Sequence, residues 1–161
     1  PPTGGATEFV STAYAYDKLD IELRNELEGL IVEHDFVYSR RLTGFYMTED
    51  QQQELPAAHH PLVRVNPFTG RKSLMIGAHA KKILGWPLQK GRELLDDLLR
   101  RATKEQHIYR HEWKAGDVVV WDNRSTLHRA TEFDTGRYRR VMQRTTVSGI
   151  SREKASNPLS T

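Results

Sequence analysis

Three side chains near the end of the sequence could do chemistry: His128, Arg140 and Arg144. A neutral histidine just past the end of a strand, as His128 is expected to be, can ligate a metal. An arginine binds a carboxylate through two parallel hydrogen bonds. The two arginines share a face of one predicted strand, with Cα atoms about 13 Å apart. A metal ligand beside two carboxylate clamps is the set that an iron enzyme with an acidic co-substrate needs.

The elements that must position these residues are mostly short strands separated by turn-forming residues. We expect strands over residues 7–11, 62–65, 73–76, 107–113, 118–121 and 137–148. The run Val118-Val119-Val120-Trp121 is too apolar for a half-exposed strand, so we predict that both of its faces are buried. Trp121 is then a core residue rather than a substrate contact.

Helices are expected between these strands. A short helix follows Ser11 or Thr12, and Asp20 caps another of about four turns, because Leu23, Leu27, Leu30 and His34 recur at helical spacing. A third helix lies between Lys90 and Gln106, with an apolar face of Leu94, Leu95, Leu98, Leu99 and Ala102.

Two segments show no regular period. Residues 36–60 mix aromatic and polar side chains, which is typical of either a lid over a pocket or a mobile surface loop. The polar tail 151–161 is predicted to be disordered. Regular β-α alternation and phosphate-binding glycine loops are absent from the sequence. The pattern predicts one α+β domain over residues 1–161, a mainly β sandwich or jelly roll with helical insertions.

The composition limits the kinds of function. The 161 residues include 24 basic and 21 acidic side chains, interspersed, for a net charge of +3. There is no basic run with interleaved aromatics, so nucleic acid is not expected as a partner. No stretch approaches the roughly 18 apolar residues of a membrane span, so no membrane partner is expected. The absence of cysteine excludes disulfides and thiolate metal sites. We expect a cytoplasmic protein, and a homo-oligomer stays open.

Several blocks together resemble one known family. Thr-Gly-Gly-Ala-Thr at 3–7 is similar to its Gly-Gly-x-Thr segment, and Ala-Gly-Asp-Val-Val-Val-Trp-Asp-Asn-Arg at 115–124 is similar to the block before its distal histidine. Further similar blocks lie at 60–64, 70–74, 76–80 and 109–111. In order, they resemble the α-ketoglutarate-dependent TauD/TfdA dioxygenases, closest to the TfdA (2,4-dichlorophenoxyacetate dioxygenase-like) branch and matching its C-terminal part. The resemblance implies a double-stranded β-helix, or jelly roll, incomplete at its N-terminus.

The resemblance also implies roles for single residues. His128 matches the distal ligand of Fe(II), Thr7 and Arg140 match the groups that hold α-ketoglutarate, and Arg144 matches the arginine that binds the primary substrate. The implied cofactor and co-substrates are Fe(II), α-ketoglutarate and O₂. Three other candidate metal ligands, His79, His107 and His111, receive no role from the resemblance, and neither does the pair His59-His60.

One family feature is missing from these residues. The His-x-Asp/Glu pair that supplies the other two iron ligands would lie before Pro1, and a single histidine is a poor iron site. We therefore expect a longer polypeptide with such a pair upstream; an inactive homologue is the alternative.

The expected reaction is hydroxylation of a small carboxylate-bearing substrate, such as an aryloxyalkanoate, with release of succinate and CO₂. Alternatives are a taurine-type dioxygenase acting on sulfonates or sulfate esters, and a non-catalytic jelly-roll homologue. A purely structural protein would leave the two arginines unexplained.

Overall fold

A computed structural model describes residue 1 and residues 3–147. Its α-helices are α1 (Thr12–Asp17), α2 (Ile21–Leu27), α3 (Phe36–Arg41), α4 (Glu49–Gln53) and α5 (Leu88–Ala102), with a 3₁₀ turn η1 at Glu105–His107. Its strands are β1 (Thr7–Ser11), β2 (Ile31–His34), β3 (Ala58–Pro61), β4 (Val63–Val65), β5 (Lys72–Leu74), β6 (Ala80–Ile83), β7 (Tyr109–His111) and β8 (Thr126–Ala130). Sheets combined with helices agree with the predicted α+β class.

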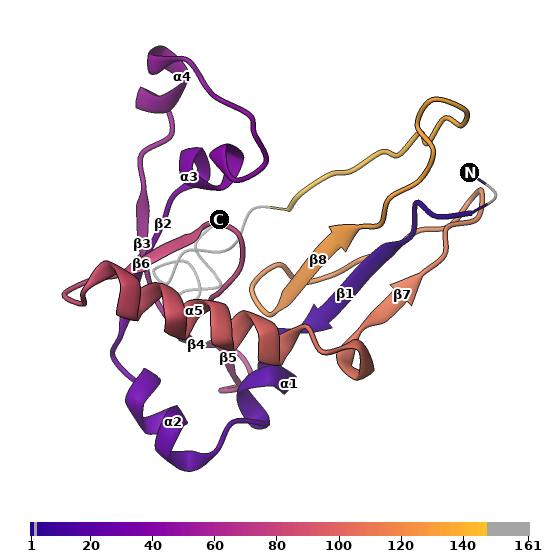
Figure 1. Ribbon diagram of the computed structural model, residues 1–161. Helices are drawn as coiled ribbons and strands as arrows, with labels where there is room; N and C mark the ends of the chain where they lie inside the picture. Colours follow the sequence, from indigo (N-terminus) through magenta and orange to yellow (C-terminus); the bar gives the residue numbers. More distant parts are fainter. Residues whose placement is uncertain (2, 148–161) are drawn as a thin grey trace, which may run out of the picture.

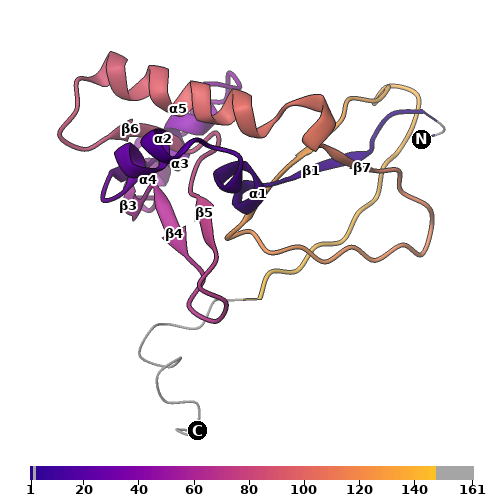
Figure 2. The same cartoon turned by 90° about the horizontal axis from the view of Figure 1, so that it is seen from below.

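The three-stranded sheet β7-β1-β8 extends to one side of the molecule (Figures 1 and 2). Both pairings are antiparallel, and β1 is the central strand. Because side chains alternate along a strand, Thr7 and Phe9 share one face of this sheet and Glu8 lies on the other. The strand register places His111 opposite Thr7, and both Tyr109 and His128 opposite Phe9.

Glu8 holds the three strands together from the opposite face. Its side chain is only 4% exposed and accepts hydrogen bonds from Arg110 of β7 at 2.6 and 2.9 Å and from Arg129 of β8 at 2.6 Å. Both arginines lie directly opposite Glu8 in the register. They hold the pKa of the Glu8 carboxyl below its usual value, so the carboxylate stays charged.

The main core lies among the other two sheets and the helices α1 and α5. Sheets β3-β2-β6 and β4-β5 pack with α1 and α5 around buried apolar side chains (Figure 1). Helix α5 has the predicted apolar face: Leu95, Leu98 and Ala102 are buried. Burial of this face anchors α5 on β6 and on α1. Because α1 directly follows β1, this packing also connects the main core to the β7-β1-β8 sheet.

The predicted four-turn helix after Asp20 is wrong in length. Asp20 does cap a helix, accepting from the backbone N–H of Leu23 at 2.8 Å, but α2 ends at Leu27. Gly29 follows with φ of +76°, a left-handed conformation that L side chains avoid. The chain turns there, and Ile31–His34 becomes the central strand of the second sheet.

Two predicted strands are wrong within the described residues. Residues 118–121 form no strand, and Val118 and Val120 are 86% and 90% exposed. Residues 137–147 form none either, while the end of that prediction, Ser148, lies outside the described residues. An extended segment forms a ladder only beside a partner strand, and the described chain places none beside either segment.

Residues 36–60 contain local structure that their composition did not reveal. They form α3, α4 and part of β3, and each of these two helices has a side-chain cap: Asp35 for α3 and Thr48 for α4. In both views they lie on the side of the molecule away from the β7-β1-β8 sheet. The lid assignment stays a prediction. The predicted disordered tail, 151–161, lies outside the described residues.

Candidate functional site

Thr7 and Arg140 meet although they are 133 positions apart in the sequence. The Nη2 of Arg140 donates to Oγ1 of Thr7 at 3.2 Å, and its Nε donates to the carbonyl oxygen of Gly5 at 2.9 Å. Thr7 is 8% exposed in the central strand, and the Arg140 side chain is half-buried. The guanidinium is therefore held in one orientation at the edge of the sheet.

The two glycines before this strand permit that approach. A Cβ at Gly4 would lie 2.3 Å from the carbonyl oxygen of Glu132, and a Cβ at Gly5 would lie 3.4 Å from Cδ of Arg140. Both residues have φ near +70°, which L side chains rarely adopt. The Gly-Gly pair thus serves close backbone packing beside Arg140.

A second donor to Thr7 is Trp113, which lies two residues after the end of β7. The indole Nε1 of Trp113 donates to Thr7 Oγ1 at 2.8 Å. The His111 ring packs edge-on against Trp113 with centroids 4.5 Å apart, and His111 Nε2 lies 3.1 Å from Oδ2 of Asp117. Sequence reasoning did not find Trp113, because its role depends on a neighbour across the sheet. Its spacing of two from His111, which places both on one strand face, was the available signal.

His128 lies within β8, directly opposite Phe9 and not just past a strand end as predicted. Its ring contacts Trp121 at 5.0 Å and Phe9 at 6.3 Å between centroids. Burial, and then the nearby charge of Arg144, lower the pKa of His128 below its usual value. The neutral ring, which is the form that binds metals, is therefore favoured. Trp121 is half-buried against these two rings rather than enclosed in the core.

Arg144 has different surroundings from Arg140. It is exposed and lines an open hollow together with Gln143 and Thr145. Its charge lowers the pKa of His128, so the guanidinium lies near the candidate metal ligand. The structure thus brings Thr7 and Arg140 together and places Arg144 near His128.

A complete metal site is not formed by the described residues. Within 3–147, no three His, Cys, Asp or Glu side chains gather as metal ligands would. His111 instead contacts Asp117 and Trp113, His79 lies 2.8 Å from the Ser39 hydroxyl, and His107 packs edge-on to Tyr14. His59 and His60 lie on β3 facing β2, where His59 pairs with Glu33 at 3.6 Å. Among the described residues, a neutral His128 could therefore supply one ligand to iron, but not a complete set.

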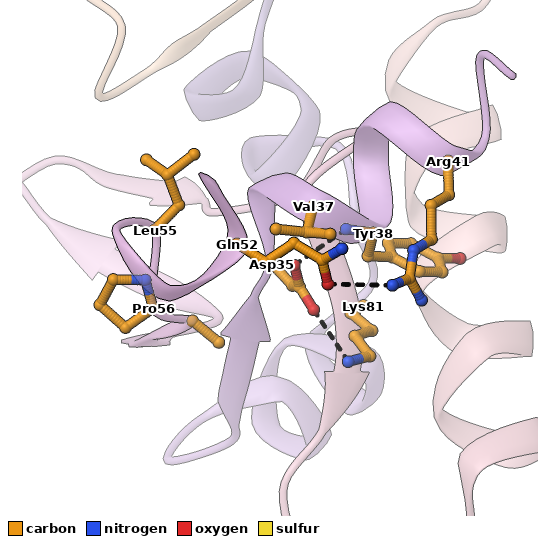
Figure 3. A pocket seen from close by; sticks show the side chains of 9 residues that line it. Asp35, Val37, Tyr38, Arg41, Gln52, Leu55, Pro56 and Lys81 are labelled. Atoms are coloured by element: carbon orange, nitrogen blue, oxygen red, sulfur yellow. Dashed lines mark hydrogen bonds and ion pairs between the residues drawn. The ribbon is translucent and has the colours of Figure 1, made fainter. Parts of the chain in front are cut away.

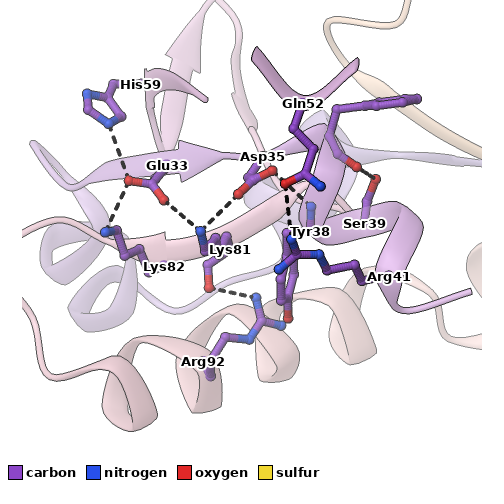
Figure 4. Close-up of polar contacts among 11 residues, drawn as sticks. Glu33, Asp35, Tyr38, Ser39, Arg41, Gln52, His59, Lys81, Lys82 and Arg92 are labelled. Atoms are coloured by element: carbon purple, nitrogen blue, oxygen red, sulfur yellow. Dashed lines mark hydrogen bonds and ion pairs between the residues drawn. The ribbon is translucent and has the colours of Figure 1, made fainter. Parts of the chain in front are cut away.

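A separate hollow lies between α3, α4 and β6 (Figure 3). These elements lie away from the β7-β1-β8 sheet in Figures 1 and 2. Lys81 at its base bonds Asp35 at 2.9 Å and Glu33 at 3.4 Å, and Arg41 at its rim donates to Gln52 at 3.1 Å (Figure 4). These contacts join α3 and α4 to the second sheet. Lys81 is thus paired with carboxylates and Arg41 with an amide oxygen, which is the pattern of a structural network.

Comparisons with known proteins identify the class to which this fold belongs. The chain belongs to the family described as "Taurine catabolism dioxygenase TauD, TfdA family", whose model matches residues 1–146. It is 45% identical over 148 residues to the α-ketoglutarate-dependent 2,4-dichlorophenoxyacetate dioxygenase of Cupriavidus pinatubonensis, covering 91% of this chain and 52% of that protein. It is 38% identical over 157 residues to the (S)-phenoxypropionate/α-ketoglutarate-dioxygenase of Sphingobium herbicidovorans, covering 92% and 54%.

Solved structures agree with this membership. AAD-2 in complex with Mn(II) and N-oxalylglycine superposes with a TM-score of 0.81 at 43% identity, over 86% of this chain and 56% of that chain. A taurine dioxygenase from Burkholderia xenovorans gives 0.69 at 34% identity, over 82% and 42%. The chain therefore spans about half the length of the relatives that it matches. Among the described residues, no helix has the length and apolar character needed to cross a bilayer.

Proposed function

We propose that these residues form the co-substrate-binding part of an Fe(II)- and α-ketoglutarate-dependent dioxygenase. The enzyme hydroxylates a small anionic substrate, for which an aryloxyalkanoate is the first choice. One O₂ and one α-ketoglutarate are consumed, one oxygen atom enters the substrate as a hydroxyl group, and succinate and CO₂ leave. The described sheets would belong to a jelly roll completed by chain outside these residues.

The single observation that carries this proposal is the contact between Thr7 and Arg140. Two residues that the family resemblance assigns to keto-acid binding are joined by a 3.2 Å hydrogen bond across 133 positions. The guanidinium is also fixed by the Gly5 carbonyl, so its orientation exists before a ligand arrives. A fixed guanidinium beside a hydroxyl suits the distal carboxylate of α-ketoglutarate.

The other two residues have separate tasks in this proposal. His128, neutral because burial lowers its pKa, supplies one ligand to iron. Arg144 binds the anionic group of the primary substrate near His128. Iron, when bound, supplies the activation of O₂; its remaining ligands come from outside the described residues, so no further step is assigned to it.

Relatives favour the aryloxyalkanoate. The dichlorophenoxyacetate and phenoxypropionate dioxygenases match at 45% and 38% identity, whereas an α-ketoglutarate-dependent sulfate ester dioxygenase from Pseudomonas putida matches at 32%. A carboxylate and a sulfate both suit an arginine, so Arg144 alone does not separate the two substrates.

The test is substrate-dependent succinate formation by the full-length polypeptide with Fe(II), α-ketoglutarate and O₂. Phenoxyacetates, sulfonates and sulfate esters are compared, each with and without iron. The proposal expects iron-dependent succinate and a phenol from the phenoxyacetates. Turnover of sulfonates or sulfate esters alone would support the taurine-type alternative. Iron-independent or absent succinate with every substrate would leave the non-catalytic homologue.

A further inference from the structure

The Thr7 hydroxyl receives two hydrogen bonds from groups that can only donate. Neither an indole nor a guanidinium group contains an atom that can accept a hydrogen bond. Trp113 Nε1 lies 2.8 Å and Arg140 Nη2 lies 3.2 Å from Thr7 Oγ1. A hydroxyl oxygen has two lone pairs and one hydrogen. Both lone pairs are therefore occupied, and the hydroxyl hydrogen is the only group that Thr7 has left to offer.

That hydrogen has no acceptor within the part of the chain that the structure describes. Thr7 is nevertheless 8% exposed, so its hydroxyl is largely removed from water. A buried O–H without an acceptor is costly. The arrangement is complete only when an oxygen acceptor lies beside Thr7.

Arg140 has matching donors free. A guanidinium has five N–H groups. One N–H on Nε goes to Gly5 and one on Nη2 goes to Thr7, which leaves three on the two terminal nitrogens among the described contacts. A carboxylate there could accept from the terminal fork of Arg140 and from the Thr7 hydroxyl together.

We propose that Trp113 is a positioning residue that fixes the Thr7 hydroxyl as a donor to the distal carboxylate of α-ketoglutarate. The inference rests on the proposed function and adds a residue to it. Without the indole N–H, one lone pair of Thr7 is free, and the hydroxyl can rotate to donate elsewhere. Trp113 itself is held by the edge-on His111 ring, and His111 is held by Asp117, whose carboxylate also accepts from the Lys114 backbone N–H at 2.8 Å.

The experiment measures binding to the full-length, Mn(II)-loaded protein by calorimetry, so that turnover plays no part. Two ligands are compared: α-ketoglutarate and 2-oxopentanoate, which has a methyl group in place of the distal carboxylate. Trp113→Phe keeps an aromatic ring against His111 and removes the N–H. Loss of one hydrogen bond of typical strength should weaken α-ketoglutarate about three- to tenfold and leave 2-oxopentanoate unchanged. Trp86→Phe, the same substitution two residues before α5 begins, is the matched control.

A double-mutant cycle then asks whether Trp113 acts through Thr7. Thr7→Val should weaken α-ketoglutarate, and adding Trp113→Phe to it should cause no further loss. If Trp113→Phe does not fold, as judged by its circular dichroism spectrum, Trp113→Tyr replaces it in the same cycle.

Three results would count against the inference: equal weakening of both ligands, no weakening of α-ketoglutarate, or additive losses in the double variant. A different result would count against the proposed function itself. That result is a wild-type protein that binds α-ketoglutarate no more tightly than 2-oxopentanoate.

Discussion

Arg140 and Arg144 are the same residue type four positions apart, yet their surroundings differ, which supports the different ligands that we propose for them. Arg140 is half-buried and tied to Thr7 and Gly5, whereas Arg144 is exposed near His128. Arg140→Ala should therefore raise the apparent KM for α-ketoglutarate about ten- to 100-fold, the effect of losing a charged hydrogen-bond partner, and change the KM for the primary substrate little. Arg144→Ala should do the reverse. Steady-state kinetics with each co-substrate varied in turn measures both.

Arg139→Ala is the matched control, because Arg139 is an exposed arginine next to Arg140 and has no assigned ligand. It should change neither KM by more than about twofold, since exposed charges contribute little. Equal weakening of α-ketoglutarate by Arg140→Ala and Arg144→Ala, with the primary substrate spared, would show that Arg144 is wrongly assigned.

The residues that the sequence singled out lie in blocks that can be matched along the chain, whereas the residues that it missed depend on contacts between strands. Thr7, His128, Arg140 and Arg144 stand in blocks whose order can be matched along the chain, and the contact between Thr7 and Arg140 agrees with their shared assignment. Trp113 and Glu8 act through neighbours on other strands. Their roles depend on the register of β7 and β8 against β1, which no local pattern specifies.

Between elements, the buried Glu8 carboxylate joins β7 and β8 to the central strand, on the sheet face opposite Thr7. Glu8→Gln keeps the size of the side chain and removes its charge. Two charged hydrogen-bonding partners are weakened, so the free energy of unfolding should fall by about 1–3 kcal/mol. Urea denaturation followed by circular dichroism measures the change.

The control for Glu8 is Glu26→Gln, an identical substitution at an exposed position of α2. It should alter the free energy of unfolding by less than about 0.5 kcal/mol, as is usual for surface sites. Equal effects of the two substitutions would mean that Glu8 contributes no more than a surface carboxylate.

Helices and strands could be predicted where the spacing of apolar residues and the turn-forming residues at both ends indicated the same element. The strand at Thr7–Ser11, the pair β4 and β5 and the helix α5 all have a clear apolar pattern and turn residues at their ends. The helix from Asp20 was predicted too long because Leu30 and His34 continue its period, but Gly29 stops it. The apolar run 118–121 was predicted buried from composition alone, although burial requires covering layers that the described residues do not provide.

For the molecule as a whole, stability should depend on pH through His34 in the second sheet. Burial, followed by the charges of His60 and His79, lowers the pKa of His34 from 6.5 to about 4. The unfolded chain takes up a proton near pH 6.5, whereas the folded chain resists until about pH 4. Stability is therefore full above pH 6.5 and falls as the pH drops toward 4, by about 2–3 kcal/mol in total.

Urea denaturation at pH 7.5 and at pH 4.5 tests this. His34→Leu fills the same space without a titrating group and should lose most of the difference between the two pH values. Part of it will remain, because burial also lowers the pKa of His60 and His79. If the free energy of unfolding of His34→Leu still differs between the two pH values as much as that of the wild type, His34 is not the cause of the pH dependence.

The order of strands in the β7-β1-β8 sheet also has a consequence for the timing of folding. Glu8 pairs with residues 102 and 121 positions later, so β1 leaves the ribosome long before either neighbour exists. During synthesis, domains form from the parts that have emerged, and long-range pairing comes late and slowly. The main core around α5 can assemble while Thr7 and Phe9 still have no partner strand. The contact between Thr7 and Arg140 is then among the last parts of this chain to form. Until β8 is made, the nascent chain must keep the central strand, Thr7–Ser11, from pairing with other chains.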